Sequence, residues 1–150
     1  EIVISSFDSD FFQLITDKVS VLRYRGDKTT ICTPKYIKDK FNITPFQYAD
    51  FKSLTGDTSD NIKGADKVGP KTAALLLNEC GSLENIISNA DGIKKPSIKQ
   101  SIIRNAEKIR TNYKIIKLDN SAQLPFAMSE LAYKFNGITT NEVLKGVGLK

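Results

Sequence analysis

Short apolar runs fill the beginning of the chain, and they predict strands. Residues 1–5 form an apolar run typical of a buried strand, and residues 11–15 read as a short helix. Residues 19–24 and 29–32 are rich in β-branched side chains, and a turn-like Arg-Gly-Asp-Lys segment separates them. The pattern therefore predicts a strand, a short helix and a β-hairpin.

From residue 33 onward the pattern is that of helices. Thr33-Pro34 and Thr44-Pro45 each place a capping hydroxyl before a proline at the first helical position. Gln47 completes a capping box with Thr44. These signals predict helices over about 34–41 and 45–54.

Later helices are predicted over 70–80, which Gly81 ends, over 83–88, capped by Ser82, and in a long element after Pro96. The long element has apolar positions at alternating steps of four and three, which form one helix face. These positions are Ile98, Ile102, Ala106, Ile109, Tyr113 and Ile116. A short helix is expected over 140–145.

The composition favours some functional classes and argues against others. The formal net charge of +5 favours an anionic partner. There is no histidine, and Cys32 and Cys80 are isolated, so a zinc site is not expected and the thiols should be reduced. No apolar run is long enough to span a membrane, and nothing indicates an oligomer. We expect a soluble cytoplasmic protein whose hydrolytic chemistry, if any, depends on a metal ion.

Two pairs of aspartates are candidate metal ligands. Asp8 and Asp10 directly follow the first predicted strand, where ligands of open parallel sheets bind. Asp57 and Asp60 lie in a loop rich in Gly, Ser and Thr. Oxygen ligands of this kind suit Mg²⁺ or Mn²⁺. The alternative roles are structural: one of the first pair would cap the short helix, Asp57 would bond its own backbone, and Asp60 would cap a turn.

The segment Lys67–Ala73 is a candidate phosphate-binding hairpin. Gly69 permits close approach of a backbone phosphate, and Lys71 and Thr72 follow at a helix start with free N–H groups. The alternative is an ordinary helix start. Between residues 94 and 117 there are eight basic residues and one acid, which favours contact with a nucleic-acid backbone, although such lysines can also be merely solvated.

Together these residues resemble a known family. The run Gly56-Asp57-Thr58-Ser59-Asp60-Asn61-Ile62-Lys63-Gly64 followed by Val68-Gly69-Pro70-Lys71-Thr72-Ala73 is similar to the G-D-x-S-D-N-I-P-G…G-[IV]-G-x-K-T-A signature of bacterial 5′→3′ exonucleases. That family includes the N-terminal domain of DNA polymerase I and stand-alone flap endonucleases. Asp8-Ser9-Asp10 with Phe12-Gln13-Leu14 resembles its D-x-D-x-x-Q-L segment. Lys63 replaces the usual proline, and Phe7 replaces a glycine.

The resemblance implies a fold and a set of roles. Residues 1–33 would be the end of a Rossmann-like (PIN-like) α/β nuclease domain, 34–119 a mainly helical helix–hairpin–helix (SAM-like) DNA-binding domain, and 120–150 a C-terminal segment. Asp8, Asp10, Asp57 and Asp60 would be catalytic through two Mg²⁺ or Mn²⁺ ions. Lys67, Gly69, Lys71 and Thr72 would bind duplex DNA, helped by K⁺ on backbone carbonyls.

The implied function is that of an Mg²⁺-dependent 5′→3′ exonuclease and flap endonuclease of DNA replication and repair. Because the family's first strand and its other acidic ligands would precede Glu1, the chain is expected to be the C-terminal half, inactive by itself. Two rival interpretations remain open. One is a non-catalytic helix–hairpin–helix DNA-binding module, and the other is a protein-interaction domain with a similar helical core.

Overall fold

The computed structural model describes residues 1–132 and 137–148. Two compact units are present, Glu1–Leu118 and Asp119–Lys150. None of the helices in the described ranges is long and apolar enough to cross a lipid bilayer.

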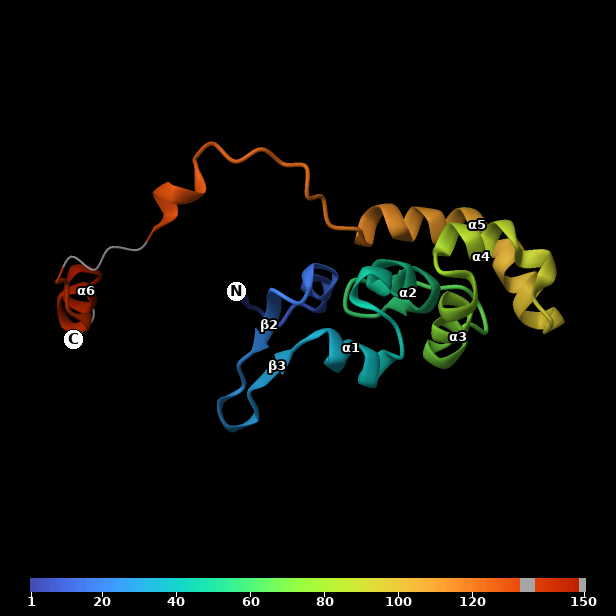
Figure 1. Cartoon of the computed structure of the whole chain (residues 1–150), viewed down its shortest axis with the longest axis horizontal. Helices are drawn as coiled ribbons and strands as arrows, with labels where there is room; N and C mark the ends of the chain where they lie inside the picture. Colours follow the sequence, from blue (N-terminus) through green and yellow to red (C-terminus); the bar gives the residue numbers. More distant parts are fainter. Residues whose placement is uncertain (133–136, 149–150) are drawn as a thin grey trace. The chain divides into compact units, whose positions relative to one another are not determined.

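The first unit begins with the predicted small sheet (Figure 1). Strand β1 (Ile2–Ser5) pairs in parallel with β2 (Val19–Arg23), and β2 pairs in antiparallel with β3 (Thr30–Cys32). The crossover between β1 and β2 contains the 3₁₀ helix η1 (Ser9–Leu14), and the hairpin turn contains η2 (Gly26–Lys28). The predicted strand, short helix and hairpin are confirmed, but the expected burial of the first strand is wrong, because Ile2 and Val3 of β1 are exposed.

The next two predicted helices are present with one difference. Helix α1 (Pro34–Phe41) has the expected bounds, but residues 45–54 are not one helix. A 3₁₀ turn, η3 (Pro45–Gln47), precedes α2 (Tyr48–Thr55). Gln47 closes the predicted capping box by accepting from the Thr44 N–H at 3.0 Å, and it also donates to the Leu77 and Gly81 carbonyls. The turn therefore joins the start of α2 to the end of a later helix.

The remaining helices of this unit match the predicted caps. They are α3 (Pro70–Cys80), α4 (Leu83–Ser88), the 3₁₀ turn η4 (Ala90–Gly92) and α5 (Pro96–Ile116). Gly81 follows α3 with a φ of 83°, which favours glycine. On the predicted apolar face of α5, four isoleucines are buried and Ala106 and Tyr113 are half-buried. Figure 1 shows α5 beside α2 and α4.

One core joins the sheet segment to the helices. The Phe12 ring of η1 lies 5.2 Å from the Tyr48 ring of α2, centroid to centroid. Buried Gln13 donates to the Ile116 carbonyl at 2.9 Å and accepts from the Leu118 N–H at 3.2 Å. These contacts hold η1 against both α2 and the end of α5. The domain boundary expected after residue 33 therefore falls within this unit.

The second unit contains η5 (Met128–Leu131) and α6 (Thr140–Gly146). Helix α6 confirms the short helix expected over 140–145. Its start carries a capping box in which Glu142 accepts from the Thr139 N–H at 2.7 Å.

A buried carboxylate in α2 predicts a pH-dependent stability. Burial raises the pKa of Asp50 to about 6, although the Leu83 N–H and Lys117 both lower it. Because the folded-state pKa lies above the unfolded value, this group favours folding below about pH 4, and that contribution is lost as the pH rises through about 6.

Replacing Asp50 with asparagine should remove this loss, because an amide keeps an oxygen for the Leu83 N–H and carries no charge. Relative to the wild type, Asp50→Asn should gain on the order of 2 kcal/mol of unfolding free energy between about pH 4 and pH 8. Urea unfolding of both proteins across this range measures the difference. A difference that does not change with pH would contradict the assignment.

Candidate metal centre and nucleic-acid interface

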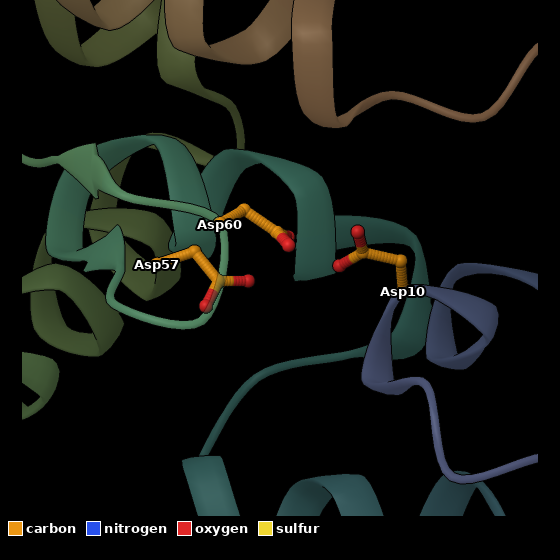
Figure 2. A group of neighbouring side chains, drawn as sticks. All are labelled: Asp10, Asp57 and Asp60. Carbon is orange, nitrogen blue, oxygen red and sulfur yellow. The ribbon is translucent and has the colours of Figure 1, made fainter.

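Three carboxylates from two distant segments meet in the first unit. Asp10 lies on η1, while Asp57 and Asp60 lie on a tight β-hairpin whose strands are β4 (Gly56–Asp57) and β5 (Ile62–Lys63). Each side chain offers one oxygen, and these oxygens lie within 4.8 Å of one another. Figure 2 shows the three side chains directed toward a common space.

Close backbone packing fixes the hairpin. The side chain of Asn112 on α5 donates to the Lys63 carbonyl at 3.0 Å and to the Ser53 carbonyl at 3.1 Å. Gly56 and Gly64 come so close that a Cβ on Gly56 would lie 2.6 Å from the Gly64 nitrogen. Helix α5 thereby holds the hairpin that carries Asp57 and Asp60 against the end of α2.

Asp57 belongs to the carboxylate cluster and also makes the turn hydrogen bonds that were its alternative role. Its Oδ1 accepts from the Ser59 backbone N–H at 3.0 Å and from the Ser59 hydroxyl at 2.5 Å. Its other oxygen, Oδ2, contacts the ammonium group of Lys52. The turn hydrogen bonds therefore set the orientation in which Asp57 joins the cluster.

Asp8 lies outside the group of three. It is exposed, and its side chain accepts from the Asp10 backbone N–H at 2.9 Å, so it caps η1. The expectation that all four aspartates converge is thus met by three, because the Asp8 side chain turns back to the start of its own helix. This is the capping role that the sequence left open as an alternative.

Lys52 is a member of the site that the sequence interpretation missed. It is buried on α2, contacts Asp57, and lies with its Nζ 3.8 Å from Oδ1 of Asp10. The position of this lysine between Phe51 and Leu54, just before the acidic loop, was the available signal. Such a buried cation requires a negative partner, and the cluster supplies it.

The electrostatics of the cluster suit a divalent cation. Burial raises the pKa of Asp10, Lys52 lowers it, and repulsion from Asp8 and Asp60 raises it further. Oδ1 of Asp10 is buried and has no hydrogen-bond partner among the described residues. A buried carboxylate oxygen that accepts no hydrogen bond, beside two further carboxylates, is a donor set that fits a hard cation such as Mg²⁺ or Mn²⁺.

The predicted phosphate-binding segment leads into α3. Gly69 is the N-cap residue and provides no capping side chain, and Pro70, Lys71 and Thr72 form the first turn. Gly69 has φ −86° and ψ 178°, which any residue can adopt, and a Cβ there would meet nothing within 4 Å. The fold therefore does not require glycine at this position, whereas close approach of an external group would require it.

Comparison with known proteins places the chain in a family. Residues 43–138 match the family model of the 5′-3′ exonuclease C-terminal SAM fold. The chain is 41% identical over 118 residues to the thermostable DNA polymerase I of Thermus filiformis, and 37% identical over 136 residues to DNA polymerase I of Streptococcus pneumoniae. These alignments cover 79% and 89% of this chain but 14% and 15% of the relatives.

The fold has also been seen in a solved structure. A bacteriophage T5 flap endonuclease, crystallised with DNA and metal ions, superposes with a TM-score of 0.68 at 23% identity, covering 76% of this chain and 42% of that one. The expected α/β segment followed by a mainly helical SAM-like part agrees with both matches. Because the family model spans more than half of the sequence, the chain belongs to the 5′→3′ exonuclease family and carries its C-terminal SAM fold.

Proposed function

We propose that this chain is the part of a 5′→3′ DNA exonuclease and flap endonuclease that supplies some of the metal ligands and the grip on duplex DNA. The observation that carries the proposal is the meeting of Asp10 with Asp57 and Asp60 in the same unit that presents an uncapped helix start at Gly69. The T5 relative, which was crystallised with DNA and metal ions, supports it.

The three clustered aspartates, with Asp8 as a further candidate, would hold Mg²⁺ or Mn²⁺, two ions in the complete enzyme. Divalent cations in such sites stabilise negative charge on a phosphodiester and make a water molecule more acidic. Two further residues of the chain would position and stabilise these carboxylates. Ser59 fixes the orientation of Asp57, and Lys52 offsets part of the repulsion between the carboxylates.

Lys67, Gly69, Lys71 and Thr72 would bind the phosphate backbone, with K⁺ assisting on backbone carbonyls. Binding through phosphates carries no sequence preference, which suits an enzyme that recognises a 5′ end or a flap in replication and repair. Two free cysteines and a DNA substrate favour a cytoplasmic location.

The two rival functions are less well supported. A module that only bound DNA would gain nothing from placing three carboxylates together near an anionic ligand. A protein-interaction domain would show no salt-dependent affinity for DNA.

The DNA-binding half of the proposal is tested by measuring the affinity of the chain for duplexes of unrelated sequence at several salt concentrations. The logarithm of the affinity should fall with the logarithm of salt concentration, with a slope of about −0.9 for each phosphate neutralised. Affinities should differ little between sequences. A flat salt response would remove the DNA-binding half of the proposal.

Gly69→Val should weaken this binding more than Lys71→Ala does, because a branched side chain keeps the phosphate away from the backbone, whereas the alanine removes one charge. The open space around Gly69 leaves the fold intact, which circular dichroism checks. Unchanged affinity of a folded Gly69→Val would make Gly69 only a helix-start residue.

A further inference from the structure

A hollow beside the Gly69 turn has polar and basic walls from two separate segments. Its volume is about 560 Å³. Asp66 and Lys67 line it from the loop before α3, and the first turns of α5 line it from the other side. The α5 residues are Pro96, Ser97, Gln100, Ser101 and Arg104.

The two walls are fixed to each other. The Ser101 hydroxyl donates to the backbone carbonyl of Asp66, and Asn105 donates to the Ser101 carbonyl at 2.8 Å. On either side of Asp66 and Lys67 the chain is anchored by buried Ala65 and Val68. Lys67 itself has a left-handed backbone with a φ of 63°. The hollow is therefore built into the fold and is not a gap between loosely placed loops.

The positive charges in this hollow are unpaired. Lys67 and Arg104 are exposed, and neither has an ion-pair partner in the part of the chain that the structure describes. Elsewhere on α5, Lys99 pairs with Asp91 at 2.7 Å and Arg110 pairs with Glu84 at 2.5 Å. Two unpaired cations beside the hydroxyl of Ser97 and the amide of Gln100 suit an anion that has several acceptor oxygens.

We propose that Lys67, Gln100 and Arg104 bind one backbone phosphate of duplex DNA, next to the phosphate held at the Gly69 turn. This inference rests on the proposed function and extends its DNA contact from the start of α3 to the side of α5. Asp66 is the one carboxylate in the lining, and it weakens the attraction. Its removal should therefore tighten binding.

The experiment compares variants of the whole chain on a short duplex over a range of salt concentrations. Arg104→Ala should weaken binding roughly tenfold, because a charge-assisted hydrogen bond is lost, and should reduce the salt slope by about one. Lys67→Ala should act in the same direction, and Asp66→Asn in the opposite one. The matched control is Lys114→Ala, which removes an exposed, unpaired lysine of the same helix outside this hollow and should change neither quantity.

A neutral methylphosphonate placed at successive backbone positions then locates the contact. At one position, the methylphosphonate should weaken binding by the wild type as much as Arg104→Ala does. At that position it should not weaken binding by the Arg104→Ala variant any further. If Arg104→Ala binds like Lys114→Ala, or no methylphosphonate position abolishes its effect, the inference is wrong. If Gly69→Val still weakens binding in that case, the proposed function stands. A wild type that does not bind duplex DNA overturns both.

Discussion

In the complete enzyme proposed above, Asp57→Asn and Asp60→Asn should each slow Mg²⁺-dependent cleavage of a 5′-flap substrate by about a hundredfold or more. Each change removes a carboxylate charge from the group that includes Asp10. Binding of the same substrate with Ca²⁺ in place of Mg²⁺ should not weaken, because loss of a negative charge does not reduce attraction to phosphate. The pair of measurements therefore separates chemistry from DNA binding.

The two variants differ in what else they disturb. Asp57 accepts from Ser59 and contacts buried Lys52, so its asparagine variant leaves the Lys52 ammonium with less compensation. Asp60 is exposed and makes no comparable contact among the described residues, which makes it the cleaner probe. Asp39→Asn, on the surface of α1, is the control and should cut normally. Normal cleavage by both cluster variants would leave the acidic hairpin with a purely structural role.

Gly64→Ala should destabilise the chain by about 3 kcal/mol or more, or prevent folding. A Cβ at Gly64 would collide with the backbone of Leu54 and Thr55, and would lie 2.5 Å from the Gly56 nitrogen. These are backbone atoms at the junction of α2 and the hairpin, and they cannot move aside as a flexible side chain could. Urea unfolding monitored by circular dichroism gives the magnitude.

Gly69→Ala is the matched control, because the space around Gly69 is open and its backbone is extended. It should change the unfolding free energy by less than about 1 kcal/mol. If Gly64→Ala were as stable as this control, the close packing between α2 and the hairpin would not exist in solution. The two glycines thus separate a requirement of the fold from a requirement of a ligand.

The helices could be predicted because their ends are marked in the sequence. Pro70 with Gly81, and Pro96 with its apolar face, gave α3 and α5 with little ambiguity. The same rules predicted one continuous helix over 45–54, and this prediction is wrong, because a 3₁₀ turn ends at Gln47. The Gln47 side chain closes the capping box and also donates to two carbonyls of another segment. Local signals cannot report such a tertiary bond.

The candidate site was predictable only in part for a similar reason. Asp57 and Asp60 share a recognisable loop, whereas Asp8 and Asp10 both follow a strand, and sequence alone does not say which of them turns inward. Lys52 was missed because lysines are almost always exposed, so a buried one stands out only when its partners are known. The hollow between Lys67 and Arg104 is lined by two segments that Ser101 joins by donating to the Asp66 carbonyl across the fold, a contact that local sequence patterns do not indicate.

Helix α5 holds both halves of the carboxylate cluster. Near its end, Asn112 donates to the hairpin that carries Asp57 and Asp60, and the Ile116 carbonyl accepts from Gln13, which lies on η1 together with Asp10. Arg104 lies on the same helix, about 12 Å from Asn112 at the α-helical rise. If Arg104 holds a backbone phosphate as proposed, α5 would fix the distance between that phosphate and the carboxylates, and with it the number of nucleotides between the held phosphate and the cleaved one.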